Sequence, residues 1–345
     1  MQHLPAPLVG AMLLSYASST LLLDQGRIFG CSGIVHSVVN RCCKSKRSRL
    51  AAGTKEDDVS WKVAATIGLV LGGVAVAQLQ GPLEALIGQP VLDPASPNML
   101  RLALAGLTVG AGTKLARGCT SGHMLIGLAR FSIRSLVAVT IFFPTAILTS
   151  RLFPSFLSRP SSQVAFIDFT QITMPILALF FVPLAASLSA YRLLSRSLAH
   201  LVQSFSVAVL FSVGLALTGM LRPSKVVAFF DFPIPSLFNS SSAADVQSWD
   251  PSLAWVAIGG VLPNIAAWRY LMKPRKTPRK RDRWDVPTGG RVEWRLVVGS
   301  VLFGIGWGLS GICPGPMLAV LGTGSGGAGL GLFVSTFLIG GYLVG

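Results

Sequence analysis

Charged residues are scarce in this sequence, making up 12% of its 345 residues, whereas an ordinary soluble domain carries about 25%. Acidic residues are the rarest, with 13 Asp and Glu against 29 Lys and Arg, and hydrophobic residues fill 51% of the chain. So little charge excludes a soluble enzyme domain large enough to define the function. It indicates that lipid is the main solvent of the chain.

The cysteines lack the patterns of a structural or metal-binding role. There are five of them, an odd number, with no C-x-x-C pair and no zinc-site spacing. We therefore predict no disulfide framework, no metal site, no cofactor and no catalytic residue set. Cys42 and Cys43 lie beside a basic segment and are interpreted as incidental or acylated.

The basic residues gather in two short loops, at 41–60 and 273–295. In a soluble protein a net charge of +16 would suggest a nucleic-acid partner, but no recognition motif accompanies it and we expect none. Short basic loops beside membrane spans are typical of cytoplasmic connections. Both loops are therefore predicted to lie in the cytoplasm.

Apolar segments long enough for a bilayer recur along the chain, where a spanning helix needs roughly 20 residues. No basic segment precedes the first of them, so we expect it to be retained rather than cleaved. The predicted fold is an all-α polytopic membrane protein with about nine transmembrane helices. These are expected at 8–23, 61–80, 98–116, 133–150, 166–188, 200–220, 250–272, 294–310 and 329–345.

Four shorter apolar stretches, at 27–40, 119–131, 222–238 and 313–321, begin with Gly, Pro or Cys or follow such a residue closely. They are too brief to span alone and are candidates for re-entrant segments. Six crossings separate the two basic loops, and six is even, so both loops fall on one side. The same count places the 231–250 loop, with its sequon Asn239-Ser240-Ser241, outside a plasma membrane.

Gly-punctuated turns form a faint internal repeat at 29–33, 117–122, 218–223 and 310–315. Two turns fall in each half of the chain, about 1–160 and 161–345. Paired interruptions in two halves point to a transporter's binding site near the midplane. We predict one transport domain over 1–345, with two pseudo-symmetric halves around a central path.

Three of these turns carry a cysteine: Cys31, Cys119 and Cys313. A free cysteine is often only a small buried hydrophobe, but three in equivalent turns favour a shared role. The first backbone N–H groups of a short helix form an anion site, and a thiol in apolar surroundings has a raised pKa and stays neutral. The residues expected along the substrate path are Cys31, Cys119, Cys313, Gly118, Gly122, His123, Gly311, Pro314, Gly315 and Pro316.

Basic residues near the turns form a surrounding shell that would draw an anion inward: Arg27, Lys114, Arg117, Arg130, Arg134 and Arg222. The alternative for each is an interfacial side chain that extends to water. Glycines elsewhere have simpler interpretations. The run 322–327 satisfies G-x-G-x-x-G without a preceding strand and is expected to connect two segments, while Gly68, Gly72, Gly106 and Gly110 are expected to serve helix packing.

Three motifs resemble the YeeE/YedE sulphur-transport family. They are the run Lys114-Leu-Ala-Arg-Gly-Cys-Thr-Ser-Gly-His-Met-Leu-Ile-Gly-Leu-Ala-Arg-Phe-Ser-Ile-Arg-Ser135, the stretch Gly308-Leu-Ser-Gly-Ile-Cys-Pro-Gly-Pro316, and Gly26-Arg-Ile-Phe-Gly-Cys-Ser-Gly33. Their order and spacing match over nearly the whole chain. The long basic loop at 273–291 and the polar loop at 231–250 depart from what is expected of bacterial members.

The resemblance implies thiosulfate uptake through broken helices, with Cys31, Cys119 and Cys313 passing the ion along by hydrogen bonds. Related sulfur or selenium species are alternative substrates, and a sulfur-carrier protein is an expected partner. A rival reading is a membrane sulfurtransferase or thiol-redox protein that uses the same cysteines covalently, with His123 as the base. A third is a purely structural membrane subunit.

Overall fold

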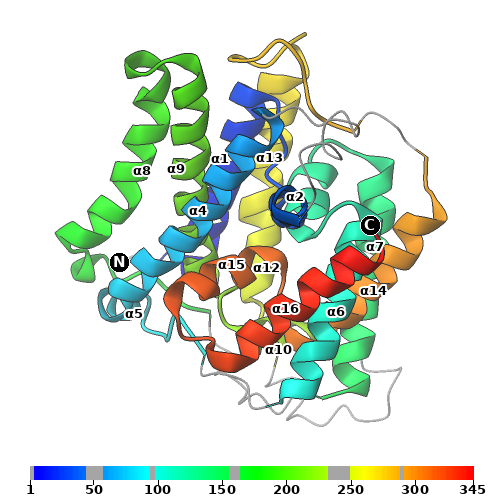
Figure 1. The fold of residues 1–345 in the computed structure, drawn as a ribbon. Coiled ribbons are helices and arrows are strands. Elements are labelled where there is room, and N and C mark those ends of the chain that lie inside the picture. Colours follow the sequence, from blue (N-terminus) through cyan, green and yellow to red (C-terminus); the bar gives the residue numbers. More distant parts are fainter. Residues whose placement is uncertain (1–3, 44–56, 94–97, 155–163, 232–248, 288–290) are drawn as a thin grey trace.

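The computed structural model describes residues 4–43, 57–93, 98–154, 164–231, 249–287 and 291–345, and the regular elements of this part of the chain are helices (Figure 1). A helical element lies at each of the nine long segments predicted from sequence. They are α1 Ala6–Gln25, α4 Asp57–Gln78, α6 Met99–Ala116, α7 Ile133–Leu152, α8 Met174–Leu193, α9 Arg196–Leu217, the interrupted element α12–η4 over Ser252–Met272, α14 Trp294–Ser310 and α16 Gly327–Leu343.

Six helical stretches are long and apolar enough to cross a membrane. Five are α1, α4, α7, α8 and α9, and the sixth joins α14 to the short helix that follows it. The other three elements fall short for local reasons. α6 contains Arg101 and Lys114, α16 has 17 residues, and α12–η4 alternates between α-helical and π-helical turns. The count of nine crossings therefore stays a prediction.

The long helices form two groups with the short helices between them (Figure 1). In one group α9 packs against α1, α4 and α8, and in the other α14 packs against α6 and α7 while α16 covers α6. Glycines allow these close approaches: a Cβ at Gly68 would meet the Phe205 backbone, and one at Gly110 would meet the Phe337 backbone. The predicted packing role of these glycines is confirmed.

Short helices follow four of the long ones, where the four apolar stretches were predicted. They are α2 Cys31–Cys43, the π-helix η1 Ser121–Leu128, α10 Pro223–Phe230 and α15 Pro314–Thr323. Each preceding helix ends in a left-handed residue: Gly26 at φ 66°, Arg117 at φ 55°, Gly219 at φ 76° and Gly311 at φ 70°. A left-handed residue stops a helix and turns the chain sharply. The chain therefore changes direction after each of these four helices.

Other connections are brief. α5 Gln80–Ile87 follows α4 directly, and the 3-10 turn η2 Phe169–Gln171 precedes α8. The glycine-rich run 322–327 joins α15 to α16 through a left-handed Gly324, as predicted. The 231–250 loop with its sequon at Asn239 and most of the 41–60 loop lie outside the described residues, as do the side chains of Cys42 and Cys43.

Candidate functional site

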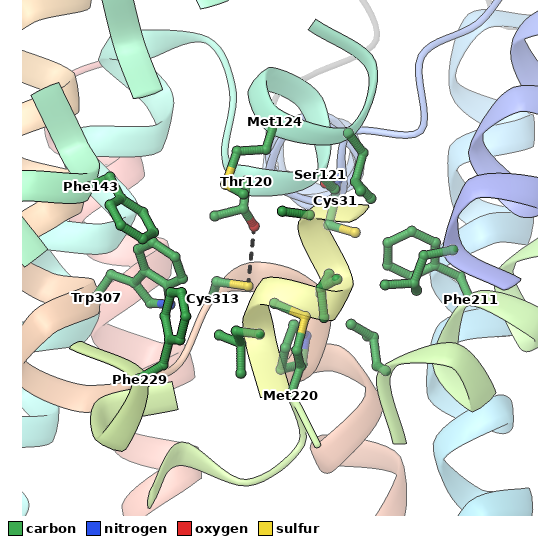
Figure 2. A pocket seen from close by; sticks show the side chains of 18 of the residues that line it. Cys31, Thr120, Ser121, Met124, Phe143, Phe211, Met220, Phe229, Trp307 and Cys313 are labelled. Atoms are coloured by element: carbon green, nitrogen blue, oxygen red, sulfur yellow. Dashed lines mark hydrogen bonds between the residues drawn. The ribbon is translucent and has the colours of Figure 1, made fainter. Parts of the chain in front are cut away.

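An apolar cavity of about 250 Å³ lies between the two helix groups (Figure 2). We call it the thiol cavity, because the Cys31 and Cys313 side chains border it. Its polar edge includes Cys31, Thr120, Ser121, Cys313, Gly315 and Pro316. Its apolar wall includes Met124, Phe143, Phe211, Met220, Phe229 and Trp307. The cavity is large enough for a small anion and offers it few polar partners.

Two of the three predicted cysteines, Cys31 and Cys313, border this cavity, and Cys119 lies next to Thr120 and Ser121 in its wall. All three are free thiols, with exposed fractions of 0% for Cys31 and Cys119 and 4% for Cys313. Two hydroxyl groups link them. Ser121 Oγ accepts a hydrogen bond of 3.0 Å from the Cys31 backbone N–H and lies 3.3 Å from Cys119 Sγ, while Thr120 Oγ1 donates to Cys313 Sγ at 3.6 Å (Figure 2).

The cysteines stand where short helices begin. Cys31 is the first residue of α2, and Cys313 is the N-cap of α15, followed by Pro314 and Gly315. Proline at the first helical position removes an N–H group that would have no partner there. A Cβ built on Gly315 would lie 3.2 Å from Cys31 Sγ, so this thiol lies against the first turn of α15. Helix N-termini of this kind favour negative charge.

A second cavity, of about 350 Å³, lies on the other side of the same turns. We call it the basic cavity, since five cationic side chains and one acidic side chain border it. Burial lowers the pKa of the Arg130 guanidinium, because the charge loses contact with water. The residues that define the basic cavity are Arg27, Ser32, Trp61, Lys62, Arg117, Gly118, Gly122, His123, Arg130, Arg134 and Asp285.

A thin partition separates the two cavities. Along α2, Cys31 borders the thiol cavity while Ser32 borders the basic cavity. Along η1, Ser121 borders the thiol cavity while Gly122 borders the basic one. A Cβ added to Gly122 would meet no atom within 4 Å, so open space adjoins the partition here. The first turns of α2 and η1 therefore lie between the two cavities.

The remaining predicted path residues lie around this partition. Gly118 and His123 border the basic cavity, and His123 bonds to Ser135 Oγ at 3.1 Å and Ala116 O at 3.3 Å. Pro316 borders the thiol cavity. Pro314 is buried in the first turn of α15, whereas Gly311 supplies the left-handed turn before it. These two shape the approach to the cavity without bordering it.

The six basic residues expected to draw an anion inward separate into two groups. Arg27, Arg117, Arg130 and Arg134 border the basic cavity, whereas Lys114 and Arg222 border neither cavity. Arg222 forms an ion pair of 2.9 Å with Asp93. The same carboxylate accepts a bond of 2.8 Å from the backbone N–H of Ser224. The N-terminus of α10, the one cysteine-free turn, is therefore occupied by an internal anion.

Sequence reasoning missed several residues of the site. Thr120 and Ser121 adjoin Cys119 in the sequence, and their hydroxyls were a readable signal because they can bond to thiols. The aromatic wall was not readable, because Phe211, Phe229 and Trp307 come from three separate helices. Trp61 was also missed, and its ring lies 5.1 Å from the Arg27 guanidinium.

Comparison with known families divides the chain in two. The family described as "Sulphur transport" matches residues 4–148, and a family of unknown function (DUF6691) matches residues 199–344. These ranges contain α1 to η1 with most of α7, and nearly all of α9 to α16. α8 lies between the two matches.

Curated relatives are shorter than this chain. A protein named "Probable transporter" from Xylella fastidiosa strain 9a5c is 37% identical over 134 residues, which are 37% of this chain and 81% of that protein. A second protein of that name in the same strain is 33% identical over 144 residues, 42% of this chain and 90% of the relative. A third, from strain Temecula1, is 36% identical over 126 residues, 36% of this chain and 74% of the relative.

The family match, the names of the relatives and the apolar helices are consistent with one another. The motifs around Cys31 and Cys119 fall inside the sulphur-transport match, the relatives are named as transporters, and the apolar helices fit an integral membrane protein. The chain belongs to the sulphur-transport family, also called the YeeE/YedE family.

Proposed function

We propose that this chain is a transporter that takes up thiosulfate, or a related small sulfur-containing anion, through the thiol cavity. One observation carries the proposal. Two free, buried thiols from turns far apart in the sequence, Cys31 and Cys313, border one apolar cavity where short helices begin, and the free thiol of Cys119 lies 3.3 Å from Ser121 Oγ in the wall of that cavity. The family and the names of the relatives support a transporter.

The chemistry of the cavity suits a sulfur-bearing anion. Helix N-termini replace part of the water that the anion loses, through backbone N–H groups and the helix dipole. Neutral thiols of Cys31 and Cys313 add weak donors and polarizable acceptors, which match a terminal sulfur atom. Conduction requires several weak sites in series, because a deep well would retain the ion. We infer that the thiols relay the anion across the partition.

The basic cavity would face the cytoplasm. Trp61, just after the first basic loop, and Asp285, within the second, both border it, so described residues next to or within both loops lie at the same cavity. The excess of Lys and Arg in those loops favours the cytoplasmic side of a plasma membrane. An anion entering from outside would then pass the thiols first and reach the basic cavity last. A sulfur-carrier protein that collects it there would complete the route.

An inverted repeat would explain the convergence of the turns. α1 runs antiparallel to α9, since Gly10 packs against Gly214 while Gln25 bonds to the His200 carbonyl at 3.1 Å. The packing pairs also correspond: α4 with α9 matches α12–η4 with α1, and α16 with α6 matches α7 with α14. α8, between the two family matches, would reverse the direction of the second half. Transporter sites lie at such repeat interfaces.

The covalent alternative has less support. A membrane sulfurtransferase needs an activated thiolate and a base beside it. His123, the one candidate base near the cysteine in sequence, borders the basic cavity and bonds to Ser135 and Ala116. Its position favours a structural role in η1 over proton transfer at a thiol.

Uptake of ³⁵S-thiosulfate by cells that lack other sulfur routes tests the proposal. Cys119→Ala and Cys313→Ala should each lower uptake by about tenfold or more, because each removes a hydrogen bond to a charged substrate. Cys42→Ala, beside the basic loop, is the matched control and should leave uptake unchanged. Membrane levels are followed through a terminal tag. Full uptake by both variants would defeat the relay, and a persulfide on Cys119 would favour the enzyme.

A further inference from the structure

Arg117 occupies a backbone position that suits glycine. Its φ is 55°, and the corresponding left-handed positions after α1, α9 and α14 are Gly26, Gly219 and Gly311. A side chain at such a position costs free energy relative to glycine, because its Cβ crowds the backbone. Backbone strain of this kind is concentrated at functional sites. The guanidinium of Arg117 is therefore held at this turn at an energetic cost.

The side chain of Arg117 borders the basic cavity and forms no hydrogen bond or ion pair with the described residues. Arg134 also borders this cavity, and its guanidinium donates a long hydrogen bond of 3.4 Å to Ala116 O. Asp285 is the one acidic residue in the cavity wall. The cavity therefore holds positive charge that its own wall does not neutralise.

Three buried donor atoms in the same wall lack an acceptor among the described residues: the Ser32 hydroxyl, Trp61 Nε1 and Arg130 Nε. Buried donors normally have partners, and an unpaired one costs free energy. Guanidinium, indole and hydroxyl donors share one type of ligand, an anion with several oxygen atoms. The residues that carry these donors all border a cavity with excess positive charge.

We propose that the basic cavity is a second anion-binding site, which binds small divalent oxyanions without using the thiols. This inference rests on the proposed function only for the identity of the physiological anion. The site recognises charge and oxygen, so it binds sulfate and thiosulfate alike. Discrimination between the two anions then belongs to the thiol cavity alone.

Isothermal titration of the purified full chain in detergent, with sulfate and with thiosulfate as separate probes, tests the site. Both anions should bind, with Kd values within about threefold of each other. Arg117→Gly should weaken the binding of both by about tenfold, through loss of a charged donor, while raising the melting temperature, because glycine relieves the left-handed position. Ser32→Ala, which removes a hydroxyl with no internal partner, should weaken binding several-fold without lowering the melting temperature.

Arg275→Gln is the matched control, since Arg275 is an exposed cation of the same basic end that borders neither cavity. It should leave both Kd values unchanged. The site is overturned if sulfate does not bind, or if Arg117→Gly leaves both affinities intact. A Cys31→Ala, Cys313→Ala double variant separates the thiol relay from the anion site in the basic cavity. If this variant still binds sulfate but no longer takes up thiosulfate, both proposals are supported. If it binds sulfate and takes up thiosulfate normally, only the thiol relay is refuted.

Discussion

The thiol cavity and the basic cavity share one wall but differ in chemistry. The first, of about 250 Å³, is bordered by sulfur, aromatic rings and two hydroxyls, and the second, of about 350 Å³, is bordered by five cations. An apolar cavity disfavours a hydrated ion and therefore selects through a few specific contacts. A basic cavity attracts any anion. If the chain transports an anion as proposed, the thiol cavity would select the anion and the basic cavity, on the other side of the first turns of α2 and η1, would collect it.

Gly315→Ala should break this comparison with the largest effect. The added methyl would lie 3.2 Å from Cys31 Sγ, so the thiol has to move. Overpacking costs about 1–3 kcal/mol, and uptake of ³⁵S-thiosulfate should fall at least about fivefold. The melting temperature should fall by only a few degrees, because the higher helix propensity of alanine offsets part of the overpacking cost. Gly331→Ala on α16, where a methyl meets no atom within 4 Å, is the control and should transport normally.

Gly122→Ala should reduce uptake less than Gly315→Ala, because it alters the basic cavity rather than the thiol cavity. The same methyl group enters the basic cavity at a point where no atom lies within 4 Å. A cavity that works by charge tolerates this, and uptake should stay within about twofold of the unchanged protein, as for substitutions away from packed contacts. A loss as large as that of Gly315→Ala would show that the partition, rather than the thiol cavity, is the narrowest point.

Sequence periodicity and punctuation were enough to place the elements. Each of the nine long segments and the four short stretches contains a helix among its described residues, because apolar runs of bilayer length and Gly or Pro breaks are local signals. The convergence of the three cysteine-bearing turns was also predictable, since a shared turn pattern in a repeat implies equivalent places. These predictions depended on residues that are close in sequence, and they required no knowledge of long-range contacts.

Long-range partners were not readable. Arg222 looked like a cation available to an anion, but its partner Asp93 lies 129 residues earlier in the chain. Lys114 adjoins the Cys119 motif in sequence, yet it borders neither cavity. The division of the site into two cavities was equally hidden, because neighbouring residues such as Cys31 and Ser32 face different ones. Helical periodicity predicts that neighbouring residues point in different directions, but it does not predict which cavity each side chain borders.

The position of bound thiosulfate in the full chain, determined by cryo-electron microscopy in lipid nanodiscs, tests the central claim most directly. Transport through the thiol cavity predicts density for the anion in that cavity. Its terminal sulfur should contact Cys31 Sγ or Cys313 Sγ, and its oxygens should point toward Thr120 and the first turn of α15. Thiosulfate bound in the basic cavity alone at saturating concentration, with the thiol cavity filled by lipid or side chains, would contradict it.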